Sequence, residues 1–529
     1  MASDGEELSE MEQLIADQVG EWSTNSNDAF TISLWQGERE VDSFNPEFTY
    51  PIYGEEEAIF GYQGLKISLA FAAHNLTPHL DVRYQKQFPP QGEIKATEVR
   101  EPLEEFLPPA AFQSVNRKTA LADAEAAKFI PPGEKLETFE AKDGTYEVWV
   151  APLSDPRAKQ ILVNMQILVP IFIEGGTILE LEYPWIVDRW KIFMLYQIDS
   201  SPPPLASRYV FAGYATSFQV FSLPSRGEEL EASLKPHPDN EIDAIVSSWS
   251  SDSKPITSLS LPSRERISQF ILLPSRQRSG LGSRLYSTVY NHLTAPSHIT
   301  ELTVEDPNEA FDDMRDIADL VHLRTTNSTF SSLRLPSSIA TTALSPSEPI
   351  PLDLLVSTDT RKTLSKQSKI QPRQLGRLIE MQLLSTIPRG NRSTSRITRK
   401  EKSSNENDRQ YYFWRLLVKE RLYQHNRDSL AQLDREERVE KVEDAVEGVQ
   451  MDYERLTDRA DARQKSMQAN GATGLKANGD SGKKRRKRVQ IEEDEEDGGE
   501  AVEDKEDASR QRKKRVRAVV EDDEDGEEV

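Results

Sequence analysis

Gln277, Gly280 and Gly282 form a Gln-x-x-Gly-x-Gly turn between an apolar segment and a segment with helical spacing. Glycine allows a backbone to approach a ligand closely. The exposed amides at the start of a helix bind phosphate groups. The turn therefore indicates a pyrophosphate site, although the motif by itself more often marks an ordinary glycine turn.

A pair of acidic residues is the second chemical feature. Glu305 and Asp306 follow the strand-like residues 299–304 and precede Pro307. A carboxylate at the end of a strand, next to a bound ligand, can act as a general base. The competing interpretation is an acidic turn that caps the next helix, because Asp before Pro is a common helix start.

The elements around both features predict a parallel crossover. Residues 266–273 have the pattern of a strand, residues 283–293 have apolar positions at helical spacing, and residues 299–304 have the pattern of a second strand. A strand, turn, helix and strand in this order form a crossover unit of an α/β sheet. Upstream, residues 191–198 and 209–221 flank a Ser/Pro turn and predict a β-hairpin.

The whole chain is predicted to be of mixed α/β class. Short strands are expected near the N-terminus, a helix at residues 120–128, helical order within 155–174, and several amphipathic helices after residue 366. Composition shifts give the boundaries. The predicted parts are an acidic leader (1–22), an N-terminal domain (23–150), a central domain (151–327) with a mobile insertion (222–263), a Ser/Thr-rich linker (328–365), a helical C-terminal domain (366–460) and a disordered charged tail (468–529).

Composition limits the possible partners and chemistry. The 529-residue chain has no cysteine, which excludes disulfides, thiolate zinc sites and a cysteinyl intermediate. Its net charge of -24 argues against direct DNA binding and favours a basic partner. The most apolar run, residues 161–173, is shorter than the roughly 20 residues of a membrane span. Neither this run nor the acidic start predicts membrane insertion or a signal peptide.

Several segments resemble known acetyltransferases. Residues 277–282 resemble the coenzyme A-binding signature of the GNAT superfamily. Residues 267–274 and 301–316 resemble the catalytic core of type B histone acetyltransferases more specifically, as do residues 48–54 and the segment from Phe172 to Glu174. The resemblance covers roughly residues 25–455. The segments 222–263 and 328–357 depart from it, and the second departure leaves open whether the late strands of the acetyltransferase fold are present.

The resemblance implies a GNAT acetyltransferase core at residues 151–327 and acetyl transfer from acetyl-CoA to lysine amines of the histone H4 tail. A lysine amine is protonated at neutral pH and must lose a proton before it attacks a thioester. The resemblance implies Glu305 as the general base and Glu174 and Asp306 as further catalytic carboxylates. Because the chain has no cysteine, we expect direct attack by the amine in a ternary complex.

The binding residues implied by the resemblance fall into two groups. The contacts expected for acetyl-CoA are Phe270, Ile271, Leu272, Gln277, Arg278, Ser279, Gly280, Leu281, Gly282, Ser283 and Asn308. Those expected for the histone are Glu55, Glu56, Glu57 and Phe221, although three consecutive glutamates are equally typical of a solvated loop. Trp190 is expected in the core rather than in the groove, and no metal is expected.

The resemblance also implies a β-propeller histone-chaperone subunit as a partner. The basic clusters 483–488 and 512–517 indicate nuclear import signals or solvated charge runs, so we expect both cytoplasmic and nuclear residence. Two alternatives remain: a catalytically degenerate protein that escorts histones, and an enzyme that acetylates small amines.

Overall fold

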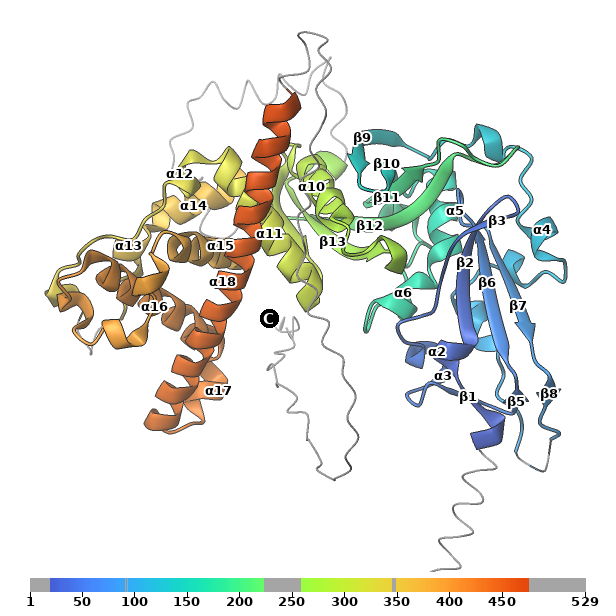
Figure 1. Cartoon of the computed structure of the whole chain (residues 1–529), viewed down its shortest axis with the longest axis horizontal. Coiled ribbons are helices and arrows are strands. Elements are labelled where there is room, and N and C mark those ends of the chain that lie inside the picture. Colours follow the sequence, from blue (N-terminus) through green and yellow to red (C-terminus); the bar gives the residue numbers. More distant parts are fainter. Residues whose placement is uncertain (1–19, 91, 93, 223–257, 345–348, 475–529) are drawn as a thin grey trace, which may run out of the picture. The chain divides into compact units, whose positions relative to one another are not determined.

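The computed structural model describes residues 20–90, 92, 94–222, 258–344 and 349–474. A six-stranded sheet with the order β14-β13-β12-β11-β10-β9 lies at its centre (Figure 1). Its strands are β9 (Glu134–Ala141), β10 (Gly144–Pro152), β11 (Trp190–Ile198), β12 (Tyr209–Phe221), β13 (Ser263–Leu272) and β14 (Ile299–Val304). The mixed α/β class predicted from the sequence is confirmed.

All neighbouring strands of this sheet are antiparallel except β13 and β14, which are parallel. Helix α10 (Leu281–Thr294) connects the parallel pair, so the predicted crossover is confirmed, and β11 and β12 form the predicted hairpin. Strand β13 begins at Ser263, three residues before the expected start. Most of the predicted insertion, residues 223–257, lies outside the described residues.

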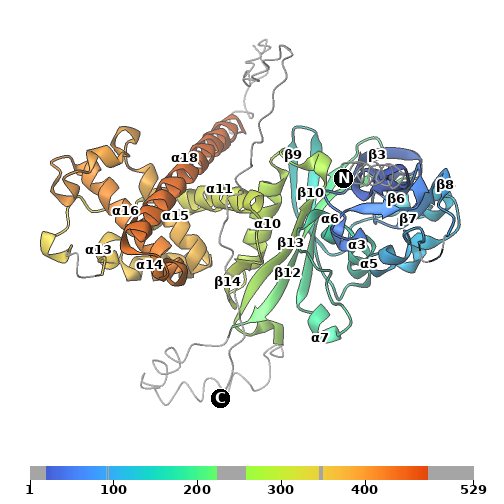
Figure 2. The same ribbon diagram turned by 90° about the horizontal axis from the view of Figure 1, so that it is seen from below.

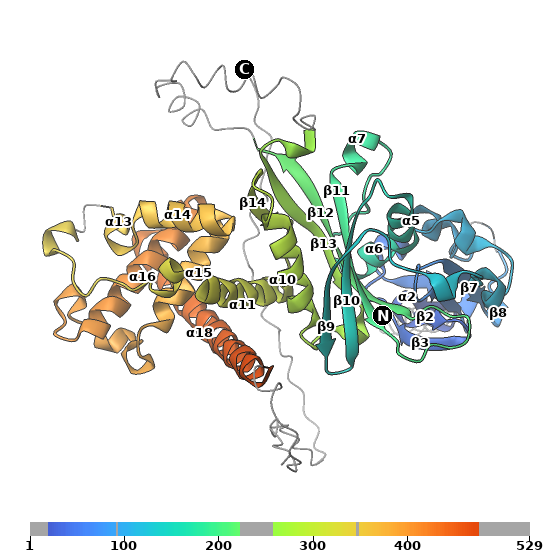
Figure 3. The ribbon, with the colours of Figure 1, turned by 90° about the horizontal axis from the view of Figure 1, so that it is seen from above.

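The two faces of the sheet contribute to two different hydrophobic cores. On β11, Phe193 and Leu195 face α10 and α11 (Glu309–Thr326), whereas Ile192 and Met194 face α5 (Pro156–Met165) and α6 (Leu168–Phe172). This alternation follows from the two-residue period of a strand. Figure 3 shows α10 and α11 on one side of the sheet and α5 and α6 on the other.

A smaller mixed sheet dominates the N-terminal part, with the order β3-β2-β6-β7. Its strands are β2 (Phe30–Gln36), β3 (Arg39–Phe44), β6 (Lys66–Ala72) and β7 (Pro78–Arg83), and two short pairs join β1 (Ser23–Asn25) to β4 (Ala58–Phe60) and β5 (Tyr62–Gln63) to β8 (Lys86–Gln87). The short helices here are α2 (Ser26–Ala29) and α3 (Tyr50–Tyr53).

The prediction of a helix at residues 120–128 is wrong. Only α4 (Arg117–Ala120) and a 3-10 turn at Ala126–Lys128 form there. The Asp123 side chain accepts a hydrogen bond from the Glu125 amide and pairs with His74 at 2.9 Å. Such local side-chain bonds to the backbone compete with helix formation.

The C-terminal part is helical, as predicted, but its helices begin earlier than expected. They are α12 (Ser328–Ser331), α13 (Leu352–Leu355), α14 (Thr358–Ser368), α15 (Pro372–Ser385), α16 (Glu406–His425), α17 (Arg427–Ala431) and α18 (Arg435–Gly474). The sequence predicted little structure for 328–357, yet Phe330, Leu335 and Leu355 are buried there. Residues 475–529, most of the predicted charged tail with both basic clusters, lie outside the described residues.

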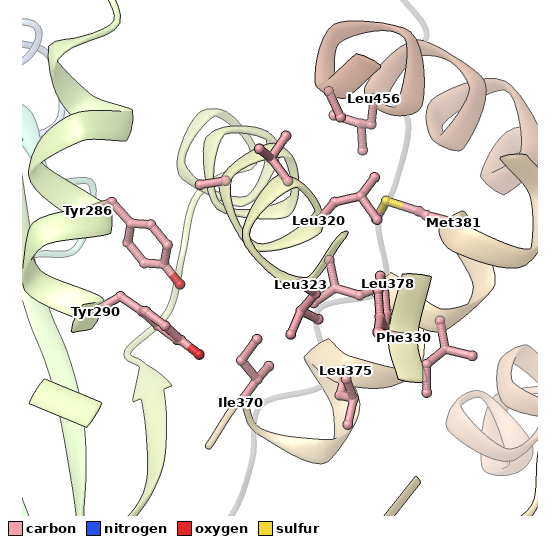
Figure 4. Packing of buried hydrophobic residues seen from close by; sticks show 14 of the residues in the cluster. Tyr286, Tyr290, Leu320, Leu323, Phe330, Ile370, Leu375, Leu378, Met381 and Leu456 are labelled. Atoms are coloured by element: carbon pink, nitrogen blue, oxygen red, sulfur yellow. The ribbon is translucent and has the colours of Figure 1, made fainter. Parts of the chain in front are cut away.

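This helical part shares one core with the central sheet. Figure 4 shows Tyr286 and Tyr290 of α10 near Leu320 and Leu323 of α11, with side chains of α15 and α18 beyond them. Within the described part of the chain no strand follows β14, and the only late pairing is an isolated bridge between Leu302 and Ile370. None of the described helices is long and apolar enough to cross a membrane.

Candidate active site

An open cleft of about 650 Å³ brings together the three acidic residues singled out from the sequence. Glu174 follows α6, and Glu305 and Asp306 follow β14. The other lining residues are Val169, Ile173, Gly175, Gly176, Thr177, Ile178, Leu179, Glu180, Ile186, Trp190, Phe218, Ser268 and Gln269. The cleft therefore lies beside the crossover unit and is walled by the chain segment that follows α6.

Glu305 is fixed in position but remains accessible. Its carboxylate accepts a hydrogen bond from Ser268 Oγ and another, at 3.4 Å, from Arg266 Nη1. Its own amide donates to the Ile267 carbonyl at 2.9 Å, which continues the parallel pairing by one bond. The side chain keeps 40% of its surface exposed. An oriented and reachable carboxylate of this kind can accept a proton.

A β-bulge in β13 lies next to Glu305. The register with β12 shifts between Ala215 and Ser217, so that Ser268 and Gln269 together oppose Thr216. The Gln269 amide donates to Thr216 Oγ1 at 3.1 Å. Bulges of this kind re-aim side chains and occur frequently beside active sites. Here the bulge directs Ser268 toward Glu305.

The bulge also leaves one edge of β13 free. Beyond it, the Gln269 and Leu273 amides point toward β12, because they donate to Thr216 Oγ1 and to the Ala212 carbonyl. Since amides alternate along a strand, those of Phe270 and Leu272 point toward the opposite edge. Strand β14 has already ended there, since its pairing with β13 stops at Ile267, so these two amides face away from both neighbouring strands.

The turn after Glu305 has a strained backbone. Asp306 has a φ of 32°, in the left-handed region that residues other than glycine rarely adopt. Asn308 is the N-cap of α11, and its side chain accepts from the Phe311 amide at 2.9 Å. The interpretation of 305–308 as a capping turn is therefore correct, and it is compatible with a catalytic role because Glu305 itself takes no part in the cap.

The glycine-containing turn leads directly into α10. Arg278 and Gly280 have φ values of 57° and 86°, and helical bonding starts with the Arg284 amide, which donates to the Gly280 carbonyl. Among the described residues, no backbone carbonyl accepts from the amides of 278–283. Backbone amides at a helix start without carbonyl partners are the type of group that binds anions in proteins, so the expected diphosphate contact here remains a prediction.

Side chains hold this turn against β13. Gln277 Nε2 donates to the Leu272 carbonyl at 3.1 Å, and Ser279 Oγ donates to the Arg276 carbonyl at 2.6 Å. A Cβ added to Gly282 would lie 3.1 Å from Met314 Sδ and 3.3 Å from Leu272 Cδ1. The structure thus brings the predicted cofactor residues of β13 and α10 together, and the absence of a side chain at 282 keeps their junction open.

The predicted histone-binding glutamates lie outside the cleft lining. Glu55 and Glu56 are exposed. The Glu57 carboxylate is occupied, because it accepts from the Thr49 and Tyr50 amides at 2.6 and 3.2 Å and from Asn27 Nδ2. The Glu57 oxygens thus cap the first turn of α3, and its expected contact with the histone remains a prediction.

The tyrosine that Glu57 helps to hold connects this block to the cleft. The Tyr50 hydroxyl accepts a hydrogen bond from the Gly175 amide at 3.2 Å. Gly175 lines the cleft next to Glu174. The segment 48–54 therefore supports the wall of the cleft through Tyr50 rather than through the glutamates that follow it.

Aromatic residues of the cleft differ from those predicted. Phe221 is 36% exposed, does not line the cleft, and lies under the Arg189 guanidinium, 4.5 Å from its ring centroid. Phe218 lines the cleft instead, with its ring centroid 4.7 Å from that of Trp190. Trp190 is 9% exposed, so it is a core residue as expected, but one edge also lines the cleft. No sequence pattern indicated Phe218, because it lies within a strand that is buried almost throughout.

Comparison with known proteins is consistent with this site. Residues 22–174 match the family described as "Histone acetyl transferase HAT1 N-terminus". Proteins named histone acetyltransferase type B catalytic subunit are similar over most of the chain. The one from Aspergillus oryzae is 38% identical, covering 85% of this chain and 88% of its own length, and the one from Neurospora crassa is 38% identical, covering 86% and 91%.

The chain belongs to this family of type B catalytic subunits. A relative from Aspergillus fumigatus, 35% identical, covers 93% of the chain, so the similarity includes the C-terminal helices. The family match at 22–174 ends at Glu174, at the rim of the cleft. In the part of the chain that the structure describes, no group of three or more His, Asp or Glu side chains is placed to hold a metal ion.

Proposed function

We propose that this protein transfers the acetyl group of acetyl-CoA to lysine side chains in the N-terminal tail of free, newly made histone H4. The observation that carries the proposal is the arrangement within one crossover unit. The edge of β13 beyond the end of β14, the start of α10 and the carboxylate of Glu305 all belong to this unit, and Glu305 also lines the cleft. The membership of the type B family supports the same reaction.

Acetyl-CoA can be accommodated along the crossover unit of β13, α10 and β14. The amides of 278–283 suit its diphosphate, since a helix start favours negative charge. The free amides of Phe270 and Leu272 suit the amide groups of the pantetheine arm, which would then run along β13 like an added strand. Asn308 is available at the start of α11, close in sequence to Glu305.

Glu305 would act as the general base. Its carboxylate accepts a proton from the lysine ammonium, and the neutral amine then attacks the thioester carbonyl carbon. The bond from carbon to sulfur breaks, and the thiol leaves with a proton. Backbone donors on β13 would stabilise the charge that develops on the carbonyl oxygen. Glu174 and Asp306 keep the cleft negative, which attracts the lysine side chain.

The substrate class follows from charge and shape. The chain has a net charge of -24, and the cleft carries Glu174, Glu180, Glu305 and Asp306. A lysine-rich tail is complementary to this surface, and its aliphatic stems would pack on Trp190 and Phe218. A β-propeller histone chaperone as partner subunit and residence in both cytoplasm and nucleus belong to the same proposal.

The experiment is acetyl transfer from labelled acetyl-CoA by the purified full-length chain. The acceptors are free histone H4, the same protein with its tail lysines replaced by arginine, and a small polyamine. Label that depends on the tail lysines supports the proposal. Label on the polyamine that H4 does not compete for would favour an enzyme for small amines. Histone binding without binding of acetyl-CoA would favour a degenerate escort protein.

A further inference from the structure

Residues 177–182, which we call the anchored segment, follow α6 and belong to no sheet, and the first four of them line the cleft together with Glu305. No helix or strand is assigned to these residues. Among the described residues, no backbone-to-backbone hydrogen bond involves any of them. A stretch of six residues without such bonds is unusual, because the peptide groups of a chain need hydrogen-bond partners.

One edge of the anchored segment is fixed to the protein through every second carbonyl. Gln269 Nε2 donates to the Thr177 carbonyl at 3.1 Å, Gln166 Nε2 to the Leu179 carbonyl at 3.2 Å, and Lys159 Nζ to the Leu181 carbonyl at 2.9 Å. These three donors come from β13, the end of α5 and the middle of α5. A repeat of two is the period of an extended strand.

The other edge of the anchored segment is open. If the odd-numbered carbonyls face the protein, the peptide groups of Ile178, Glu180 and Glu182 face the opposite direction. Residues 177–180 all line the cleft, and among the even-numbered residues the Glu180 and Glu182 side chains are exposed. The packing agrees with this alternation, because Leu179 and Leu181 contact the hydrophobic core. The segment thus presents a row of unused backbone donors and acceptors beside the candidate base.

Two exposed aromatic residues continue this edge. Tyr183 is 54% exposed, and Trp185, on α7 (Pro184–Val187), is 63% exposed. Their ring centroids lie 6.5 Å apart. Figures 2 and 3 show α7 at the end of the central sheet where β11 begins. Large exposed aromatic side chains next to a cleft are typical of binding surfaces.

The charge of this region selects the kind of partner. Residues 174–188 include Glu174, Glu180, Glu182 and Asp188 and contain no lysine or arginine. Acidic side chains around aromatic rings suit lysine and arginine, whose charged groups pair with carboxylates and stack on ring faces. The surface is also continuous with the cleft that would take the acceptor lysine.

We propose that the anchored segment binds a basic flank of the substrate polypeptide as an added β-strand, with Tyr183 and Trp185 contacting the same flank. This inference rests on the proposed function and adds a second region of contact to it. Main-chain hydrogen bonds would provide affinity with little dependence on sequence, and the aromatic and acidic side chains would select basic residues. Six extended residues span about 20 Å, so the substrate must continue about six residues beyond the acceptor lysine to use the whole surface.

The test compares two synthetic peptides that contain the same single acceptor lysine. The short peptide has about two residues on each side, and the long peptide has about eight basic and small residues on each side, enough to cover the segment at the rise of a strand. The variants are Tyr183→Ala with Trp185→Ala, and Glu182→Gln with Asp188→Asn, in the full-length chain; none of these four residues lines the cleft. Tyr84→Ala is the matched control, because Tyr84 is also an exposed aromatic residue (47%) but follows β7 of the N-terminal sheet, away in sequence from the anchored segment.

We expect each double variant to raise KM for the long peptide at least about fivefold, while kcat and KM for the short peptide stay unchanged. The control should change neither peptide. N-methylation of successive residues in the long peptide should raise KM at every second position, as pairing along one strand edge requires. The proposal would be overturned if the double variants changed KM equally for both peptides or left KM for the long peptide unchanged. It would also be overturned if the effect of N-methylation on KM showed no two-residue period.

Failure of the proposed function gives a different result. The wild-type chain would then acetylate neither peptide. Binding of a fluorescently labelled long peptide still tests the surface in that case, because the double variants should weaken it at least about fivefold and Tyr84→Ala should not. Binding that the variants leave unchanged would overturn the inference, and another segment of this chain or a different protein would then be the occupant.

Discussion

Glu305 is supported by residues that are near it in space but belong to another strand. Ser268 and Arg266 lie on β13 and contact a carboxylate that follows β14. The sequence pointed to Glu305 and Asp306 through the resemblance to type B histone acetyltransferases, whereas their place at the end of a strand by itself left a helix-capping turn as the alternative. It could not predict Ser268, because the β-bulge that directs this side chain depends on the register between β12 and β13, which no local pattern encodes.

Replacing Glu305 by Gln keeps the shape of the side chain and removes the proton acceptor. We expect kcat to fall about 10²- to 10⁴-fold, the usual contribution of a general base, with the Kd for acetyl-CoA unchanged. Glu309→Gln is the control, since Glu309 is an exposed carboxylate in the first turn of α11. Steady-state kinetics and calorimetric binding measure the two quantities. An unchanged kcat in Glu305→Gln would exclude its assignment as the base.

Replacing Ser268 by Ala tests positioning rather than proton transfer. The variant removes the hydroxyl that donates to Glu305 but leaves the carboxylate in place. We expect kcat to fall about tenfold or less, because orientation is loosened and the base is retained. Ser268→Thr keeps a hydroxyl and should restore much of the loss. A fall as large as that of Glu305→Gln would instead indicate that Ser268 itself takes part in the chemistry.

At the scale of elements, the crossover unit was predictable and the cleft around it was not. Spacing within about 40 residues gave β13, the turn, α10 and β14, because each element carries its own periodicity. Trp190 and Phe218 pair with each other in the predicted hairpin, but they reach the cleft only because residues of α6 and of the segment after it lie beside that hairpin, which no local pattern predicts. Residues 328–357 looked unstructured because single buried residues such as Phe330 and Leu355 are scattered among Ser, Thr and Pro without a period.

The junction between β13 and α10 depends on Gly282. A Cβ there would lie 3.3 Å from Leu272 Cδ1 of β13 and 3.1 Å from Met314 Sδ of α11, so the larger side chain of Gly282→Val should push α10 away from both and disturb the amides at its start. We expect the Kd for acetyl-CoA to rise at least about tenfold, the equivalent of about 1.4 kcal/mol. Gly376→Ala is the control, because a Cβ at this helical glycine meets nothing within 4 Å. It should leave the Kd unchanged and stabilise α15 by up to about 1 kcal/mol. An unchanged Kd in Gly282→Val would argue against this helix start as the cofactor site.

At the scale of the whole molecule, the C-terminal helices are joined to the central sheet by buried polar contacts as well as by apolar packing. Tyr286 of α10 donates to Asp319 of α11 at 2.8 Å, and Gln374 of α15 donates to both Asp316 and Asp319. Arg315 pairs with Asp319 at 3.6 Å. Because these groups come from three helices, loss of their hydrogen bonds would loosen the helical part from α10 and hence from the site that α10 forms.

The direction in which folding stability changes with pH follows from the pKa of Asp319. Burial raises the pKa of Asp319 from 3.8 to about 6, while Arg315 and the hydrogen bonds from Tyr286 and Gln374 lower it less. The folded protein therefore holds this proton more tightly than the unfolded chain does. The contribution of Asp319 to stability is fully present below about pH 4 and is lost as the pH rises through about 6.

Asp319→Asn should remove this dependence while keeping an oxygen acceptor for Tyr286. Relative to the variant, the free energy of unfolding of the wild type should fall as the pH rises, by about 3 kcal/mol over the whole titration. About 1.4 kcal/mol of this fall should occur between about pH 5 and 7.5. Urea unfolding across this range measures the difference. Asp444→Asn, at an exposed position on α18, is the control and should give a curve parallel to the wild type. A parallel curve for Asp319→Asn as well would mean that Asp319 is ionised in the folded protein throughout this range, and that its pairing with Arg315 outweighs its burial.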